Sequence, residues 1–212
     1  MTEKECVEKL VKDGYIHNAE IKKAFLAIHR ADFVSETHKA QAGENLPLPI
    51  DIDNLFVPQP STAAFMIELL KPKRGEKILV VGGGSGWISG IIAHIILGKE
   101  KTETFSGVVC MVEPSEDAMH FATKNLEQYR FISDGIVDVH NGAWDGIYNE
   151  HGPYDGIIAL RGIPRFPEAW ELMIRVGGRM IAPVGDSIIL KEKKSSTDYE
   201  TKRYFGFNFP EF

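Results

Sequence analysis

The sequence KILVVGGGSGW, at residues 77–87, places a glycine-rich turn directly after a run of branched apolar residues. The unbroken apolar run at 78–81 is typical of a parallel strand that is buried on both faces. The apolar residues 88–97, which follow the glycines, have the composition of a buried helix. This order of strand, turn and helix indicates a nucleotide site in an open α/β sheet. Glycine lets the backbone turn sharply and approach a ligand, and the helix N-terminus offers unpaired N–H groups.

The spacing of the glycines separates the classes of nucleotide site. A dinucleotide fingerprint, G-x-G-x-x-G, needs its third glycine at the position of Trp87. The spacing found here is G-x-G-x-G over Gly82, Gly84 and Gly86, which suits S-adenosylmethionine-dependent methyltransferases. No Lys-Ser or Lys-Thr pair follows the glycines, so a P-loop is excluded. Taken alone, the motif leaves open a turn that binds nothing.

Length and charge restrict the function further. A chain of 212 residues suits one domain with a sizeable core. We expect one methyltransferase-like domain over 1–212, with N-terminal helices and a proline-stiffened loop in 1–60 and a Rossmann-like core in 61–212. The net charge of -6 argues against binding to nucleic acid, which needs a basic surface. No stretch approaches the roughly 18 apolar residues of a membrane span, so we expect no membrane partner.

Cysteine and histidine spacing gives expectations about metals and compartment. Cys110 lies inside an apolar strand pattern, far in sequence from Cys6, which favours a buried thiol over a disulfide. The histidines show no H-x-x-x-H spacing and the cysteines no C-x-x-C spacing, so we expect no metal site. The N-terminal sequence MTEKECVEKL lacks the apolar core of a signal peptide. We therefore expect a cytoplasmic protein, with a monomer as the simplest oligomeric state.

Apolar periodicity alternates between helix and strand along the chain. Helices are predicted at 2–12, 18–29, 63–70, 88–97, 116–129 and 167–175, with Asn18 capping the second and Ser61 or Thr62 the third. Strands are predicted at 78–81, 107–112, 135–139, 156–160 and 179–183, the last preceded by a turn at 177–178. Segments 188–190 and 203–209 are expected to pair as an antiparallel edge. The pattern predicts a Rossmann-like, doubly wound α/β fold: a mainly parallel sheet with helices on both faces and a small N-terminal helical subdomain.

In such sheets the ligand lies outside the carboxyl ends of the strands. Glu113 ends the second strand, where its carboxylate can accept hydrogen bonds from ribose hydroxyls; the alternative is that Glu113 or Ser115 caps the next helix. The segment HNGAWD at 140–145 follows the third strand, and Trp144 packs either on a base or in the core. The proline-stiffened loop FVPQP at 56–60 is either a wall of the ligand pocket or a structural connector.

Several blocks of the chain, in the same order, resemble the protein-L-isoaspartate O-methyltransferase family of class I S-adenosylmethionine-dependent enzymes. The stretch at 78–87 is similar to the family's "VLEIGTGSGY", and Gln59-Pro60 with the following helix resembles its "ISxP" substrate loop. The other similar blocks are HRADFV at 29–34, LPLPI at 46–50, PYDGIIAL at 153–160, GGRMIAPVGD at 177–186 and Phe209-Pro210. The resemblance implies transfer of a methyl group from S-adenosylmethionine to the carboxylate of isoaspartyl residues in damaged proteins, leaving S-adenosylhomocysteine.

The resemblance also implies the site residues. The expected cofactor-binding residues are Gly82, Gly83, Gly84, Ser85, Gly86, Glu113, Pro114, Gly142, Ala143 and Trp144. The substrate-loop candidates are Val57, Pro58, Gln59, Ser61 and Thr62. No single side chain is identified as catalytic. An isoaspartyl carboxyl group has a pKa of about 4, so it is already ionised at neutral pH and needs no general base. Catalysis is then expected to rest on alignment of the reacting atoms.

Three positions depart from the family pattern. Pro58 stands where the family has the serine of its substrate loop, Val80 where it has an acidic residue before the glycines, and Ala143 where it has an aspartate near the adenine. Asp145 replaces that aspartate only if the loop shifts. Each lost polar contact costs roughly 1–3 kcal/mol. Two alternatives to the isoaspartyl enzyme therefore stay open: a non-catalytic binding module, and a methyltransferase with another acceptor.

Overall fold

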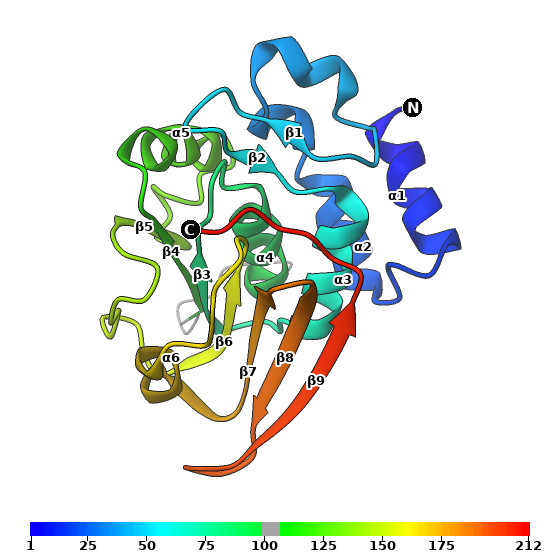
Figure 1. Cartoon of the computed structure of the whole chain (residues 1–212). Coiled ribbons are helices and arrows are strands. Elements are labelled where there is room, and N and C mark those ends of the chain that lie inside the picture. Colours follow the sequence, from blue (N-terminus) through cyan, green and yellow to red (C-terminus); the bar gives the residue numbers. More distant parts are fainter. Residues whose placement is uncertain (99–106) are drawn as a thin grey trace.

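The computed structural model describes residues 1–98 and 107–212 and arranges them around a seven-stranded sheet (Figure 1). The strand order is β5-β4-β3-β6-β7-β8-β9. Neighbours from β5 to β7 pair in parallel, and β8 and β9 continue as an antiparallel edge, as the sequence predicted. The strands are β3 (Lys77–Val81), β4 (Val108–Glu113), β5 (Val137–Asn141), β6 (Tyr154–Ala159), β7 (Ile174–Val184), β8 (Ser187–Lys193) and β9 (Tyr199–Phe205).

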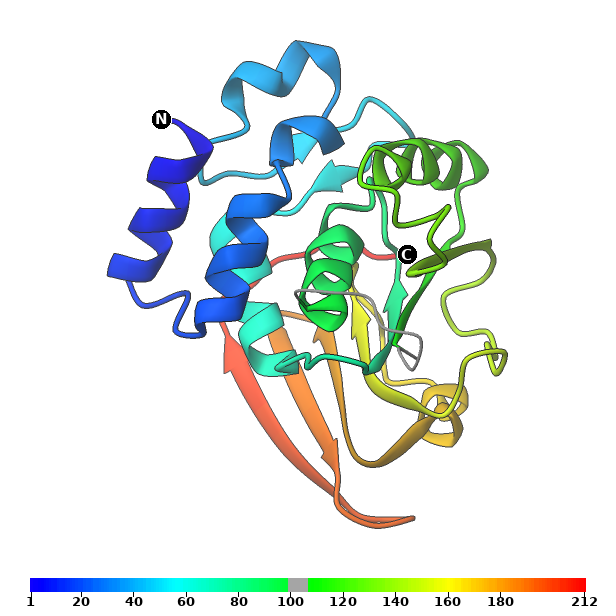
Figure 2. The ribbon, with the colours of Figure 1, turned by 180° about the vertical axis from the view of Figure 1, so that it is seen from behind.

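Alternate residues of the central strands enter two different cores. Ile78 and Val80 of β3 face a large cluster built with α1 to α5, and Leu79 and Val81 face a smaller one built with α6. Figure 2 shows α2, α3 and α4 against the first face. Helices on both faces of a mainly parallel sheet confirm the predicted fold class. The helices are α1 (Glu3–Lys12), α2 (Ala19–Ala27), α3 (Pro60–Leu70), α4 (Trp87–Leu97), α5 (Glu116–Glu127) and α6 (Glu168–Met173).

Local chemistry explains the start of the N-terminal helices. The Thr2 hydroxyl accepts a hydrogen bond from the Glu5 amide, and the Glu5 carboxylate accepts one from the Thr2 amide, which makes a capping box at the start of α1. The Asn18 side chain accepts a bond of 2.8 Å from the Glu20 amide, which confirms the predicted cap of α2.

Cys6 and Cys110 are both buried free thiols, as expected. Among the described residues, no helix combines the length and apolar character that crossing a bilayer requires.

Two local predictions were wrong. Neither Ser61 nor Thr62 caps α3, because the helix begins at Pro60, with Gln59 as its N-cap residue. Proline suits the first helical position, where its missing N–H has no partner to lose. The glycines at 177–178 do not form a turn between elements but lie inside β7, where the pairing with β6 shifts register. Gly177, at φ 82°, lets the strand bulge without ending it.

The sheet reverses its winding between β3 and β6. From β3 the chain proceeds to β4 and β5 in one direction, and β6 and β7 lie on the opposite side of β3. Such a switch leaves a crevice outside the carboxyl ends of the two adjacent strands. Two segments lie over that end of the sheet in Figure 1: the small hairpin of β1 (Leu48–Pro49) and β2 (Phe56–Val57), and residues 206–212, drawn in red. We call residues 206–212 the crossing segment.

A buried arginine holds the loops on the substrate side of this crevice. Arg30 begins the short 3₁₀ helix Arg30–Phe33 and is 1% exposed. Its guanidinium lies 5.3 Å from the ring centroid of Trp87, and burial lowers its pKa to about 10. The guanidinium donates to the backbone carbonyls of Ala42, Glu44, Leu46, Val57 and Pro58, at 2.7–3.3 Å. One side chain therefore connects the segment before β1 to the loop after β2.

Replacement of Arg30 is expected to loosen both loops together. Arg30→Met keeps much of the side-chain volume but leaves several buried carbonyls without a donor, so we expect a loss of about 3 kcal/mol in the free energy of unfolding. Urea denaturation measures the loss. Arg203→Met, at an exposed position of β9, is the control and should change stability by less than about 0.5 kcal/mol. Equal effects of the two substitutions would contradict the anchoring role.

Candidate cofactor and substrate site

A cavity of about 550 Å³ lies over the carboxyl ends of β3 and β6. Three of the predicted cofactor glycines and three of the predicted substrate-loop residues line it together: Gly82, Gly83, Gly84, Pro58, Gln59 and Thr62. The hairpin region, the two residues that follow β6 and the crossing segment complete the wall with Pro47, Leu55, Phe56, Leu160, Arg161, Gly206, Phe207, Asn208, Phe209 and Pro210. The fold therefore brings the glycine turn and the proline-rich loop to one space, although more than twenty residues separate them in sequence.

The glycine turn presents bare backbone to this cavity. Gly84 has φ 55°, and a Cβ built there would meet no atom within 4 Å. Gly83 packs so closely on Met111 that a Cβ would lie 2.5 Å from that side chain. The turn is held by bonds from the Gly82 amide to the Val112 carbonyl, at 2.8 Å, and from the Gly86 amide to the Gly83 carbonyl, at 3.0 Å. Gly83 therefore allows close packing against Met111, and Gly84 leaves the backbone open to the approach of a ligand.

Ser85 and Gly86 are not among the residues that line the cavity, and they organise the helix that follows. The Ser85 hydroxyl accepts a bond from the Trp87 amide, and the Ser85 carbonyl accepts one from Asn125 of α5. Gly86, at φ 89°, packs against Leu126. These two predicted cofactor residues hold α4 and α5 together at the turn, and a direct role toward a ligand stays a prediction.

Glu113 joins β4 to the glycine turn. Its carboxylate is 0% exposed and accepts bonds from the Gly84 amide, at 2.8 Å, and the Ser115 amide, at 3.0 Å. Burial raises the pKa of the Glu113 carboxyl above its usual value, although the two amides and the charge of Arg161 act in the opposite direction. Ser115 caps α5 by accepting from the Ala118 amide. The ribose role of Glu113 stays a prediction; in this structure its carboxylate fixes the turn.

The loop after β5 carries the predicted adenine-side residues. The Asn141 side chain donates to the carbonyls of Glu113 and Pro114, both at 3.0 Å, which attaches this loop to the end of β4. The Ala143 carbonyl accepts a bond of 2.6 Å from the Tyr148 hydroxyl. Gly142 packs against the same tyrosine ring, where a Cβ would lie 2.3 Å from the hydroxyl oxygen. Asp145, the suggested replacement for the aspartate missing at 143, is exposed.

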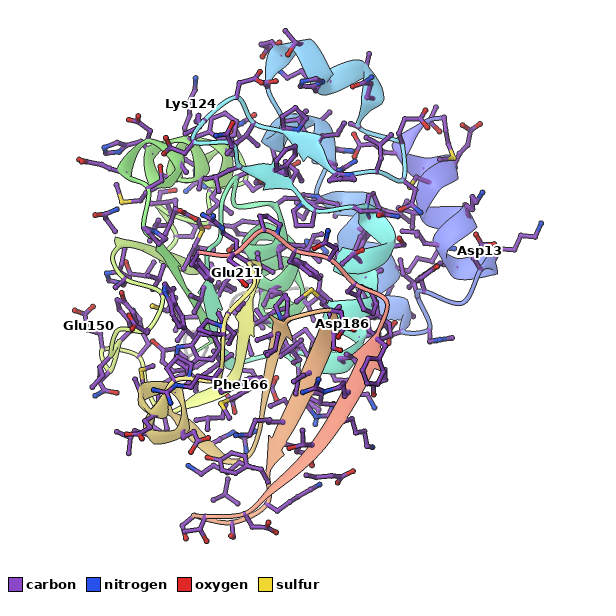
Figure 3. The ribbon with its side chains drawn as sticks, in the orientation of Figure 1. Asp13, Lys124, Glu150, Phe166, Asp186 and Glu211 are labelled. Atoms are coloured by element: carbon purple, nitrogen blue, oxygen red, sulfur yellow. The ribbon has the colours of Figure 1, made fainter. Side chains whose placement is uncertain are left out.

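An aromatic ring of the crossing segment occupies the slot beside Trp144. The rings of Trp144 and Phe212 are stacked at a centroid distance of 5.6 Å, and the Arg161 guanidinium lies 5.2 Å from the Phe212 centroid. A Cβ on Gly82 would lie 2.5 Å from the Phe212 ring. The backbone of the segment is fixed by a bond from the Gly162 amide to the Pro210 carbonyl and by one from Arg161 to the Glu211 carbonyl; Figure 3 labels Glu211 over the strand ends.

The substrate-loop candidates divide into two groups. Pro58, Gln59 and Thr62 line the cavity. Val57 is fully buried, and Ser61 is 5% exposed with its amide bonded to the Asn45 side chain at 2.9 Å. The Gln59 amide group donates to the Ser61 hydroxyl at 3.0 Å. Ser61, which does not line the cavity, thus orients the Gln59 side chain. The polar side chains of this loop that line the cavity are Gln59 and Thr62.

Sequence reasoning missed Arg161 and Phe212. Arg161 is the second residue after β6, and its position close to a strand end was the one signal that could have identified it. Its Nε is buried without a hydrogen-bond partner among the described residues, while the side chain lines the cavity. Phe212 gave no local signal, because its place in the slot depends on a segment folding back across the sheet.

Comparison with known proteins identifies the family. A family model described as protein-L-isoaspartate(D-aspartate) O-methyltransferase matches residues 1–207. The chain belongs to this family. It is 34% identical over 213 residues to the protein-L-isoaspartate O-methyltransferase of Pyrococcus abyssi, covering 97% of this chain and 92% of that protein. The enzyme of the same name from Methanopyrus kandleri is 32% identical, over 96% and 87% of the two chains. The family inferred from the sequence motifs is confirmed.

Solved structures confirm the fold. The chain resembles, with a TM-score of 0.86 and 18% identity, a Plasmodium falciparum protein described as an isoaspartate methyltransferase in complex with S-adenosyl-L-homocysteine. This match covers 100% of the chain and 98% of that protein. A second protein-L-isoaspartate O-methyltransferase has a TM-score of 0.87 and 24% identity, covering 100% of this chain and 66% of that one. The chain therefore shares its overall fold with these two proteins.

The raised pKa of Glu113 predicts a pH dependence of stability. The folded protein retains the Glu113 proton to higher pH than the unfolded chain, whose value is near 4.5. The protonated Glu113 side chain therefore stabilises the folded protein below pH 4.5, and this stabilisation is lost as the pH rises through the pKa of Glu113 in the folded state. Each unit of difference between the folded and unfolded pKa corresponds to about 1.4 kcal/mol. We expect the free energy of unfolding of the parent chain to fall relative to that of Glu113→Gln over this window, as measured by urea denaturation at a series of pH values. Glu116→Gln, at an exposed position of α5, should stay parallel to the parent; a parallel Glu113→Gln curve would contradict the prediction.

Proposed function

We propose that this chain transfers a methyl group from S-adenosylmethionine to the side-chain carboxylate of isoaspartyl residues in damaged proteins. The observation that carries the proposal is the single cavity lined by both the glycine turn and the loop at 58–62, in a chain of this family. The acceptors in this proposal are peptides or proteins that contain isoaspartate, without nucleic acid as a partner.

The residues of the site fit an adenosyl ligand in two ways. The backbone of Gly82, Gly83 and Gly84 faces a cavity of about 550 Å³, within the range of roughly 300–1,000 Å³ of small-molecule sites. Trp144 and Arg161 both contact the flat ring of Phe212, so a base that replaced this ring would have the same two neighbours. The Plasmodium falciparum structure, in complex with S-adenosyl-L-homocysteine, supports the same ligand class for this fold. Bound cofactor would supply the electrophilic methyl group.

The protein's own part in the reaction is to position the acceptor. An isoaspartyl carboxylate is ionised at neutral pH, so no residue needs to remove a proton. Gln59, oriented by Ser61, and Thr62 supply polar groups at the cavity wall, and Arg161 places a positive charge at the same cavity. Leu55 and Phe56 add apolar surface to the cavity wall. Holding reactants in line accounts for large rate enhancements without a catalytic acid or base.

Two observations favour a second candidate function, a binding module without catalysis. Both oxygens of Glu113 are engaged by backbone amides, and Phe212 fills the slot beside Trp144. This second candidate is also favoured by the three altered positions, Pro58, Val80 and Ala143. Val80 is a core residue of β3. A methyltransferase with a different acceptor is the third reading, because the cavity wall on the substrate side has lost the family's serine at Pro58.

We also propose a cytoplasmic, monomeric protein. The support is the acidic net charge of -6 together with two unpaired buried thiols, which suit a reducing compartment. Size-exclusion chromatography with light scattering tests the monomer, and fractionation of cells tests the compartment.

The proposed activity predicts discrimination between two peptides that differ by one backbone linkage. We expect the protein to bind S-adenosylmethionine in a calorimetric titration and to methylate an isoaspartyl peptide at least about tenfold faster than its aspartyl twin, a difference of about 1.4 kcal/mol. Gly84→Val should lose binding, because its side chain enters the cavity; Gly135→Val is a matched control, with φ 66° and open space at a distant turn. Absence of cofactor binding by the parent protein would exclude both enzyme candidates, and binding with equal methylation of the two peptides would favour another acceptor.

Removal of the Phe212 ring predicts tighter cofactor binding. The ring must leave its place on Trp144 before a base can stack there, and an aromatic pair contributes about 0.5–1.5 kcal/mol. Phe212→Ala should therefore lower the dissociation constant of S-adenosylmethionine roughly two- to tenfold, as measured by calorimetry. Phe205→Ala, at an exposed position of β9, is the control. A weaker complex with Phe212→Ala would mean that the ring belongs to the cofactor site.

A further inference from the structure

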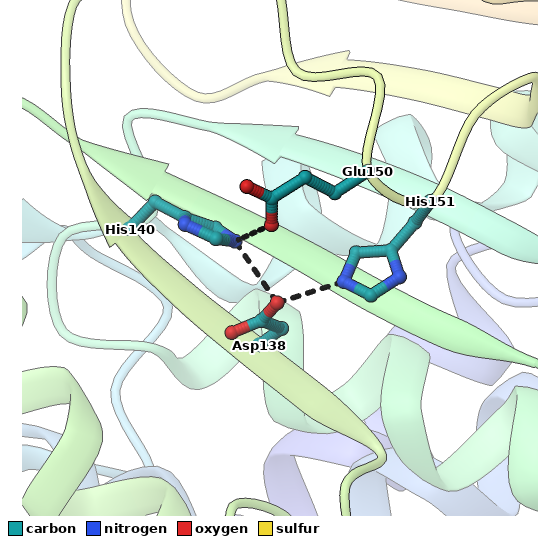
Figure 4. A group of neighbouring side chains, drawn as sticks. All are labelled: Asp138, His140, Glu150 and His151. Carbon is teal, nitrogen blue, oxygen red and sulfur yellow. Dashed lines mark hydrogen bonds and ion pairs between the residues drawn. The ribbon is translucent and has the colours of Figure 1, made fainter.

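Four side chains outside the cavity converge on one point at the edge of the sheet. Asp138 and His140 lie on β5, and Glu150 and His151 lie on the loop that leads to β6 (Figure 4). The Asp138 Oδ2 atom is 2.7 Å from Nε2 of His151 and 3.0 Å from Nε2 of His140. The same His140 nitrogen is 3.9 Å from Oε2 of Glu150. Figure 3 shows Glu150 well apart from Glu211 of the crossing segment.

The fold creates this cluster from two short sequence pairs. Asp138 and His140 are two residues apart on one strand, so their side chains project from the same face. The loop after β5 then returns along the strand and brings Glu150 and His151 to that face. The pattern D-x-H followed ten residues later by E-H is not a helical metal motif. The expectation of no metal site rested on such helical and C-x-x-C spacings, which do not describe a site shared by a strand and a loop.

The distances suit one small cation. The four donor atoms all lie within 4.8 Å of one another. Zn²⁺ binds imidazole nitrogen and carboxylate oxygen at about 2.0–2.2 Å in tetrahedral geometry, which separates neighbouring donors by roughly 3.3–3.5 Å. The observed separations of 2.7, 3.0 and 3.9 Å lie on both sides of that value. Small side-chain rotations therefore place all four donors around one ion, which would replace the hydrogens now shared between them.

Charge and donor type restrict the ion. Two carboxylates carry two negative charges, which balance one divalent cation when both imidazoles are neutral. Ca²⁺ and Mg²⁺ prefer shells made of oxygen alone. Two imidazole nitrogens with two carboxylates instead match Zn²⁺ and its first-row neighbours.

We propose that Asp138, His140, Glu150 and His151 form a binding site for a divalent transition-metal ion, with Zn²⁺ as its natural occupant. Three of the ligands are half-buried and preorganised, with 26–43% of their side chains exposed, and Glu150, at 74%, closes the site from the solvent side. As plain surface ion pairs these contacts would contribute only about 0–1 kcal/mol. A metal ion bound by all four side chains would stabilise the folded protein more than these ion pairs do.

The ion would have a structural role in the loop 142–151. The His140 ring lies 6.4 Å from the Tyr148 ring, and the Tyr148 hydroxyl donates to the Ala143 carbonyl. Trp144, the next residue, forms the aromatic slot beside the cofactor cavity. Metal binding at Glu150 and His151 would therefore fasten the far end of the loop whose near end carries Trp144. This role does not depend on the proposed methyl transfer.

Cobalt titration tests the site directly. Protein without an affinity tag is treated with EDTA, dialysed and titrated with Co²⁺ alone. We expect one equivalent to bind with the visible absorption of tetrahedral Co²⁺ and without the near-ultraviolet charge-transfer band of a thiolate ligand. Zn²⁺ should displace the Co²⁺ and raise the melting temperature, because an ion that binds only the folded state stabilises it. Absence of tetrahedral absorption, or a thiolate band, would overturn the proposal.

Matched variants separate a metal site from a cluster held by hydrogen bonds. His151→Gln and Asp138→Asn should each weaken Co²⁺ binding at least about tenfold, although Asn still accepts a hydrogen bond from His151. His120→Gln alters another histidine that is paired with a glutamate, on exposed α5, and should leave binding unchanged. Melting in EDTA shows whether each variant is folded. Equal Co²⁺ affinities of His151→Gln and His120→Gln would refute the site. Hydrogen exchange of residues 142–151 should slow when Zn²⁺ is added; unchanged exchange despite binding would refute the loop role.

Discussion

Burial of β3 on both faces is the constraint on which the rest of the structure depends. Its residues alternate between two separate cores, so the strand must lie inside the sheet with helices on either side. Its neighbours β4 and β6 run parallel to it, which requires crossover connections and brings three strand ends to one edge. Because the chain departs from β3 toward β4 and later returns on the other side at β6, the crevice opens at Gly82 and Leu160. The cavity lies there for a topological reason.

Two buried ionic groups then determine the shape of that crevice. Arg30, on the substrate side, donates to carbonyls of the segment before β1 and of the loop after β2. Glu113, on the cofactor side, fixes the Gly84 amide and the start of α5. Each charge is costly to bury and is retained where several backbone groups satisfy it. The polar network around the site thus holds the backbone of the glycine turn and of the loop at 57–58 in place.

The crossing segment and the loop after β5 connect the site to the rest of the surface. Phe212 and Trp144 form a stacked pair whose other contacts are Arg161, in the segment after β6, and Trp170 of α6. The same loop extends to Glu150 and His151 at the sheet edge. A ligand in the slot and an ion at the edge would therefore act on opposite ends of one loop, through contacts that the chain already makes.

The sequence by itself determined the elements whose signals are local. The apolar run at 78–81 with its glycine spacing predicted the central strand and turn, Asn18 predicted a helix start, and the ordered motifs predicted the family. The sequence-based prediction was wrong at Pro60 and Gly177. A proline and a glycine at these positions each have two local interpretations, and only the packing of the chain distinguishes them.

Tertiary structure alone decided which distant residues meet. Nothing local in the chain indicates that Phe212 stacks on Trp144, that Arg161 lies over that ring, that Arg30 bonds to loops at 42–46 and 57–58, or that Glu150 and His151 reach β5. Short-range patterns report the period and the turn chemistry of a segment. Contacts between segments depend on how strand order and loop paths fold the whole chain, and that information appears only once every element is packed.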